Sequence, residues 1–113
     1  GIYIANSDDA FVSGNSIDDT GLPNYATNGI YLSNVTNSVV DDNYVTYITN
    51  GIRVEGSTNI DVTNNELYDD TFAIVVGNST DIYVSQNDIE LTYQGVGVSG
   101  SSDVRIHDND IIN

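Results

Sequence analysis

The stretch from Gly51 to Asn65 reads GIRVEGSTNIDVTNN, and most of the chain consists of variants of it. Two short segments of alternating character, 52–54 and 60–62, flank a turn around Gly56. The other copies begin at Gly1, Gly29, Ala73 and Gly95. The last three steps are each 22 residues, and a fixed period of this size is typical of a repeat architecture.

Aliphatic residues recur at fixed positions of the copies. The second position holds Ile2, Ile30, Ile52, Ile74 and Val96, and the fourth, tenth, twelfth and seventeenth positions are also mostly aliphatic. Residues two apart point to the same face of a strand, so these columns predict a shared interior with the intervening residues outside. The chain shows no helical stripe of useful length, which predicts an all-β fold.

Asparagine occupies the fifteenth position of every copy. The five residues are Asn15, Asn43, Asn65, Asn87 and Asn109. Strands in neighbouring layers lie about 4.8 Å apart, which lets such amides hydrogen-bond above and below as a ladder. We therefore expect these asparagines to be structural rather than catalytic.

The composition limits the partners and the compartment. Two Arg, no Lys and 17 acidic residues give a formal net charge of −15, which argues against nucleic acid and anionic membranes. Such an acidic chain is favoured in concentrated salt, where counterions screen the repulsion, and the alternative is a surface that binds divalent cations. The absence of Cys excludes disulfides and thiol chemistry, and no run of about 18 apolar residues predicts a membrane span.

The pattern G-I-x-V-x-G-S-x-N-I-x-V-x-x-N-x-L resembles the right-handed parallel β-helix repeat of pectate lyases, polygalacturonases and related carbohydrate-active proteins. The resemblance covers residues 1–113 and implies a single solenoid domain of about five coils, as a segment of a longer solenoid or as a stacking unit. The first copy has six extra residues, and we expect a loop near Gly21–Ala26, which contains the one Pro.

The resemblance does not extend to catalytic motifs. In polygalacturonases the catalytic acids lie around the start of the G-I-x-V strand, where this chain has Thr49-Asn50-Gly51 and similar amide and hydroxyl residues. Inverting hydrolysis needs two carboxyl groups about 6.5–9.5 Å apart. A pectate-lyase-like mechanism would require Arg53 or Arg105 as the base, and we expect these two on different faces. The sequence therefore favours a non-catalytic protein and predicts no catalytic residue.

Several outward residues are candidates for binding or modification. Tyr3 and Tyr31 share a column and could stack on sugar rings or contact another subunit. The acidic residues Glu66, Asp88, Asp110 and Asp108 are candidate ligands for Ca²⁺, although no calcium-loop motif is present and no other cofactor is expected. Asn34 and Asn78 begin N-x-[ST] sequons and are candidate glycosylation sites in an exported protein.

These features leave three functional hypotheses. The first is a non-catalytic structural module at the cell surface or outside the cell, which stacks head to tail on itself or on flanking coils of a parent protein. The second is a glycan-binding module whose partner is a polysaccharide. The third is a fragment of a polysaccharide lyase or hydrolase.

Overall fold

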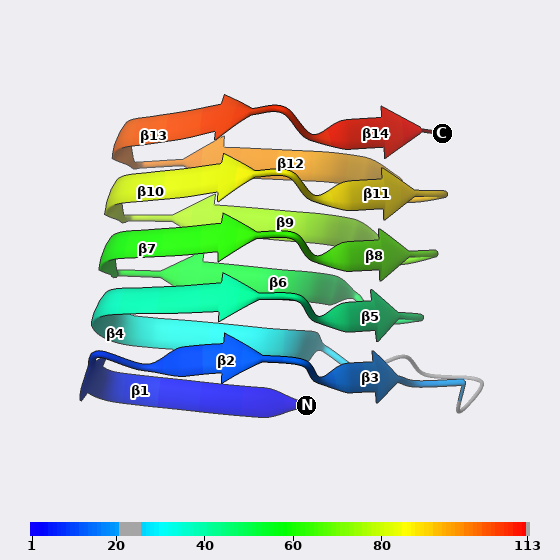
Figure 1. Cartoon of the computed structure of the whole chain (residues 1–113), viewed down its shortest axis with the longest axis horizontal. Helices are drawn as coiled ribbons and strands as arrows, with labels where there is room; N and C mark the ends of the chain where they lie inside the picture. Colours follow the sequence, from blue (N-terminus) through cyan, green and yellow to red (C-terminus); the bar gives the residue numbers. More distant parts are fainter. Residues whose placement is uncertain (21–25, 113) are drawn as a thin grey trace.

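The chain folds into a stack of parallel strands, seen in Figure 1 as a computed structural model that describes residues 1–20 and 26–112. The strands are β1 (Ile2–Asp8), β2 (Phe11–Ser13), β3 (Ser16–Asp18), β4 (Asn28–Asp41), β5 (Tyr44–Thr46), β6 (Asn50–Glu55), β7 (Thr58–Thr63), β8 (Glu66–Tyr68), β9 (Phe72–Gly77), β10 (Thr80–Ser85), β11 (Asp88–Glu90), β12 (Gln94–Ser99), β13 (Ser102–His107) and β14 (Asp110–Ile112). The described residues include no helix.

The strands form five layers, namely β1–β3, β4–β5, β6–β8, β9–β11 and β12–β14. One sheet contains β12-β9-β6-β4-β7-β10-β13 with β1 and β2 paired to β4, and the other contains β14-β11-β8-β5-β3. All pairings are parallel. The predicted fold class is confirmed, but the stack makes about four turns, slightly fewer than the five coils predicted.

The register follows the sequence period. Ile30 pairs with Ile52, and Ile52 pairs with Ile74, each 22 residues further along. Ile2 pairs with Ile30 across 28 residues, so the six extra residues of the first copy leave the register unchanged. The predicted loop at Gly21–Ala26 lies outside the described residues except for Ala26.

The turns are built by residues that accept a left-handed backbone. Among the described residues, fifteen other than glycine have positive φ, and most are Asn or Asp, such as Asn64 (φ 54°) and Asn78 (φ 47°), which lie between strands. Asn and Asp tolerate this region because their short polar side chains bond to the local backbone. Six of the 17 acidic residues occupy such positions: Asp9, Asp42, Asp69, Asp81, Asp103 and Asp108. Part of the acidic composition therefore has a conformational cause.

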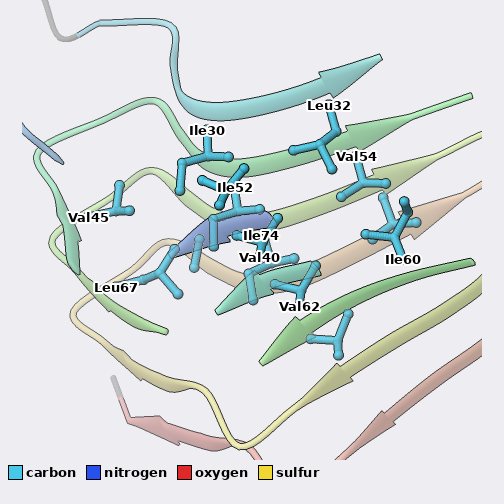
Figure 2. Packing of buried hydrophobic residues seen from close by; sticks show 14 of the residues in the cluster. Ile30, Leu32, Val40, Val45, Ile52, Val54, Ile60, Val62, Leu67 and Ile74 are labelled. Carbon is cyan, nitrogen blue, oxygen red and sulfur yellow. The ribbon is translucent and has the colours of Figure 1, made fainter. Parts of the chain in front are cut away.

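The core is a column of aliphatic side chains along the axis (Figure 2). Its fully buried members include Ile30, Ile52, Ile74, Val62 and Leu67. Burying each such side chain stabilises the fold by about 1.5–3 kcal/mol. The outer layers are less covered, and in the fifth layer Val98, Ile106 and Ile111 are 42%, 46% and 47% exposed.

Candidate functional site

The five asparagines form a continuous hydrogen-bonded ladder inside the turn between the two sheets. From Asn15 to Asn87, each Nδ2 donates to the Oδ1 of the asparagine one layer above, at 2.9 to 3.0 Å. The same Oδ1 also accepts the backbone N–H of the asparagine one layer below, at 2.9 to 3.1 Å. Each Nδ2 from Asn43 onward also donates to a valine carbonyl one layer below. The ladder thus satisfies polar groups that the turn would otherwise bury unpaired.

We expect Asn65→Ala to reduce the free energy of unfolding by about 2–4 kcal/mol, because it leaves the buried amide and backbone N–H of Asn43 without their acceptor. Equilibrium urea unfolding measures the change. The exposed neighbour provides the control: Glu66→Gln should change stability by less than about 0.5 kcal/mol. Equal effects of the two substitutions would contradict the structural role of the ladder.

An aromatic and cationic column lies on the outer face of β1, β4 and β6. The rings of Tyr3 and Tyr31 stack at 5.0 Å, and the guanidinium of Arg53 lies 4.8 Å from the centre of the Tyr31 ring. Both faces of Tyr31 are therefore covered, and the open aromatic face belongs to Tyr3, which is 65% exposed. A sugar ring that stacks on this column has access to Tyr3 and not to the face of Tyr31.

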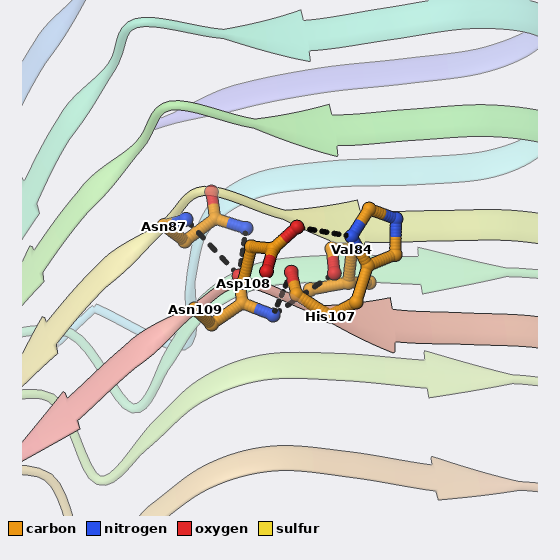
Figure 3. Close-up of polar contacts among 5 residues, drawn as sticks. All are labelled: Val84, Asn87, His107, Asp108 and Asn109. Atoms are coloured by element: carbon orange, nitrogen blue, oxygen red, sulfur yellow. Dashed lines mark hydrogen bonds and ion pairs between the residues drawn. The ribbon is translucent and has the colours of Figure 1, made fainter.

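A second polar cluster lies on the outer face of β7, β10 and β13. A shallow groove there is lined by Asp61, Thr63, Tyr83, Ser85 and His107. The Arg105 side chain lies over the Tyr83 ring, with a centroid distance of 5.3 Å, and donates to the Tyr83 hydroxyl at 2.6 Å. Figure 3 shows the His107 ring beside Asp108, with 2.9 Å between Nδ1 and Oδ2. Arg53 and Arg105 lie in different columns, so each packs against its own tyrosine.

The candidate Ca²⁺ ligands are only partly brought together. Glu66, Asp88 and Asp110 pair in register along β8, β11 and β14, which places three carboxylates in one exposed column. Asp108 instead contacts His107. Within residues 1–20 and 26–112, no group of three or more His, Cys, Asp or Glu side chains is arranged to hold a metal ion.

The two sequon asparagines are exposed: Asn34 lies within β4 at a residue of positive φ, and Asn78 lies between β9 and β10. Asn34 donates from Nδ2 to Asn6 Oδ1 at 2.7 Å, and Asn78 donates to Glu55 Oε1 at 2.6 Å. Both side chains are accessible from the lateral surface. Attachment of a glycan to either nitrogen would replace that hydrogen bond.

A family model described as "Right handed beta helix region" matches residues 1–113. The chain belongs to the right-handed β-helix family. Comparisons with curated proteins and with solved structures found no match. Among the described residues there is no α-helix that is long and apolar enough to cross a membrane.

The β-helix also buries one carboxyl group whose interior position was not predicted from the sequence. Asp70 is 3% exposed and occupies the column of Ile48 and Thr92. Its Oδ1 accepts the Ile48 N–H at 2.9 Å, whereas its Oδ2 and the Thr92 Oγ1 have no partner among the described residues. A Cβ on Gly51 would lie 2.8 Å from Oδ2, so the glycine leaves room for the carboxyl. The 22-residue spacing from the apolar Ile48 was the signal that could have revealed it.

The pKa of Asp70 is raised to about 7, chiefly by burial; the hydrogen bond from the Ile48 N–H acts in the opposite direction, and the charge of Asp69 adds a smaller increase. The folded-state pKa lies above the ordinary value of 3.8, so Asp70 favours folding most at low pH. This contribution is lost as the pH rises from about 4 through 7. The neutral carboxyl therefore fits the column better than the carboxylate does.

We expect Asp70→Asn to increase the free energy of unfolding at pH 8 by roughly 2 kcal/mol, because the amide needs no deprotonation inside the column. At pH 4 the difference should shrink to less than about 1 kcal/mol, since both side chains are then neutral in the folded state. Urea unfolding of the two proteins between pH 4 and 8 measures the effect. The same difference at every pH would show that Asp70 does not titrate in this range.

Proposed function

We propose that the protein is a non-catalytic structural module of an extracellular or cell-surface assembly, in which the β-helix acts as a stiff, acidic spacer. The observation that carries this proposal is the Asn ladder, which joins all five layers through buried and partly buried hydrogen bonds. Beside it, Ile and Val columns fill the interior in the same register. Each layer therefore adds about 4.8 Å of length with the same set of contacts.

The acidic outer surface suits a medium in which salt or cations screen its negative charges. The net charge is −15, and the acidic residues are distributed over all five layers. Salt screens repulsion between such exposed charges over a distance of about 8 Å at physiological ionic strength. The accessible sequons at Asn34 and Asn78 also suit an exported surface, and glycans there would project sideways without blocking the stack.

A spacer should tolerate the removal of one complete layer. We expect deletion of residues 51–72, which is one 22-residue repeat, to leave a cooperatively folded protein, because Asn43 then meets Asn87 and the aliphatic columns stay in register. Far-UV circular dichroism and urea unfolding measure the outcome.

The matched control is the deletion of residues 60–80. It removes one residue fewer and places the junction inside a strand, away from the corner that takes up the six extra residues of the first copy. The side chains that follow the junction in that strand turn to the opposite face, so we expect this deletion to abolish cooperative folding. Loss of folding in both deletions would contradict the modular role. Folding of both would show that the register is not the decisive constraint.

Glycan binding is the second candidate function. It is favoured by the groove on β7, β10 and β13, where Asp61, Ser85 and His107 present polar groups beside the Tyr83 ring. The open face of Tyr3 offers a separate stacking surface.

The third candidate is a lyase or hydrolase fragment, in which Arg53 and Arg105 are the bases to test. Cleavage of acidic polysaccharides that is lost in Arg53→Ala or Arg105→Ala would support it.

Affinity electrophoresis in gels that contain acidic or neutral polysaccharides tests glycan binding. If the groove binds the polysaccharide, the affinity measured from the retardation should weaken at least about fivefold in Tyr83→Ala. If the stacked column binds it, Tyr3→Ala should have this effect instead. One aromatic stacking contact contributes on the order of 1 kcal/mol, which sets the size of the change. Leu91→Ala, on a different outer turn, serves as the control. No retardation with any polysaccharide would exclude this function for the sugars tested.

A further inference from the structure

We propose that a hollow on the outer face of the smaller sheet binds an aliphatic primary ammonium group, of the kind that polyamines and lysine side chains carry. The hollow lies on β5, β8 and β11, which belong to the three central layers, and β3 and β14 flank it on either side (Figure 1). It is lined by Tyr44, Glu66, Leu67, Tyr68, Asp88 and Glu90. This site is additional to the spacer role and does not rest on it.

The strand register brings the polar side chains of the hollow together. Glu66 pairs with Asp88 one layer above, and in the same way Tyr68 lies below Glu90. Alternate residues of a strand point to one face, so these four side chains share the outer face of the sheet, while Leu67 points into the core. Layers lie about 4.8 Å apart and alternate residues about 6.6 Å apart, so the centre of this rectangle is roughly 4 Å from each corner in the plane of the sheet. One small group at the centre therefore reaches all four side chains.

The three carboxylates of the hollow have no counterion within the described part of the chain. Glu66, Asp88 and Glu90 make no side-chain hydrogen bond or ion pair with another described residue. Other carboxylates are bonded by neighbouring amides, as Asp41 is by Asn64 at 2.8 Å. Both arginines of the chain pack on tyrosines of the larger sheet instead. Three negative charges therefore gather in the hollow, and a cation that offsets them has to come from outside.

The size of the hollow limits the ligand to a small group. Its volume is about 230 Å³, below the roughly 300–1,000 Å³ of sites that take drug-sized molecules. It is also more enclosed than the groove on β7, β10 and β13. The hollow therefore fits the end of one alkylammonium chain rather than a row of sugar rings.

Two tyrosines distinguish the hollow from a plain row of exposed carboxylates. Tyr68 is half-buried beside Glu66 on the same strand, and Tyr44, which is 37% exposed, lies one layer below Glu66. Such ring surfaces suit the methylene stem of an alkylammonium, which packs on apolar surface while its charged end stays with polar groups. A ring within about 6 Å of the ammonium also attracts it through the cation–π interaction. The rings therefore favour an organic cation over a hydrated inorganic ion.

The number of carboxylates and their spacing favour a primary ammonium among organic cations. A primary ammonium has three N–H donors, and the hollow offers three separate carboxylates. A guanidinium instead prefers both oxygens of one carboxylate in a plane, and a quaternary ammonium has no donor. Calcium takes about six to eight oxygens at roughly 2.3–2.6 Å. In the part of the chain that the structure describes, no cluster of acidic or histidine side chains is arranged to hold a metal ion.

Nuclear magnetic resonance titration of the isotope-labelled protein at about 0.15 M ionic strength tests the proposal. The probe is Nα-acetyl-lysine amide, whose single positive charge avoids the multivalent attraction that a polyamine has for a chain of net charge −15. We expect saturable shifts confined to the backbone amides around the hollow on β5, β8 and β11, with a dissociation constant on the order of 1–10 mM. Pentylamine, a second monovalent probe without peptide groups, distinguishes the sources. Tighter binding of the lysine derivative indicates a protein partner, and tighter binding of the bare amine indicates a free amine.

Three comparisons separate the hollow from general attraction to the acidic surface. The trimethylated lysine derivative keeps the charge but has no N–H donor, so it should bind at least about fivefold more weakly. Asp88→Asn should weaken binding of the primary amine by a similar factor, because it removes one charge-assisted hydrogen bond. The matched control is Asp81→Asn, which removes the same charge from an exposed residue of β10 and should leave the affinity within about twofold. Tyr68→Leu should weaken binding roughly threefold through loss of the ring.

Several results would overturn the proposal. Shifts that spread over all five layers, or equal affinities for the primary and trimethylated probes, would show that only the net charge attracts the amine. Equal effects of Asp88→Asn and Asp81→Asn would place binding outside the hollow, and no saturable shift up to about 50 mM amine would exclude the site. Displacement of the amine by an equal concentration of Ca²⁺ at constant ionic strength would identify a metal site instead. The spacer role is tested separately by the two deletions.

Discussion

The structure depends on one constraint: every layer must present its hydrogen-bonding groups directly above those of the layer below. In the larger sheet the backbone meets this demand. At the corner between the two sheets, the residues on either side of each asparagine also bond between layers through the backbone, but the N–H of the asparagine itself bonds to a side-chain oxygen. The asparagine side chains fill that gap by accepting the N–H below and donating to a valine carbonyl. A change of one residue between the strands of the larger sheet and the asparagine would move the amide away from its partners. Extra residues between β3 and β4 do not, because Asn15 still bonds to Asn43 across 28 residues.

Much of this could be predicted from the sequence, because the constraint acts on side chains that recur at fixed positions. The aliphatic columns and the Asn column are visible in a single chain once the copies are aligned. The left-handed turns were only partly visible. The sixth-position turn stood out through Gly56 and Gly100, whereas Tyr47 and Leu91, at φ 60° and 54°, carry no residue signal for that conformation.

Other features depend on contacts that spacing does not fix. The alignment of Asp70 with Ile48 and Thr92 places it in an inward column, but carboxyl groups are rarely buried, and only the folded structure shows this one in the interior. Likewise the columns placed Tyr3 with Tyr31, but the stack on Arg53 depends on rotamers chosen in the folded state. The conformational demand for Asp in turns also explains part of the acidity that composition alone attributed to salt or to cations.

The regular spacing of the layers also makes the molecule a line of charge. Fifteen net negative charges over five layers of about 4.8 Å correspond to roughly one charge per 1.6 Å of axis, close to the roughly 1.7 Å per charge of duplex DNA. A polyelectrolyte of that density holds a condensed atmosphere of counterions. Its association with any polycation would then be driven by release of those ions, with a logarithmic dependence on salt that requires no individual binding site.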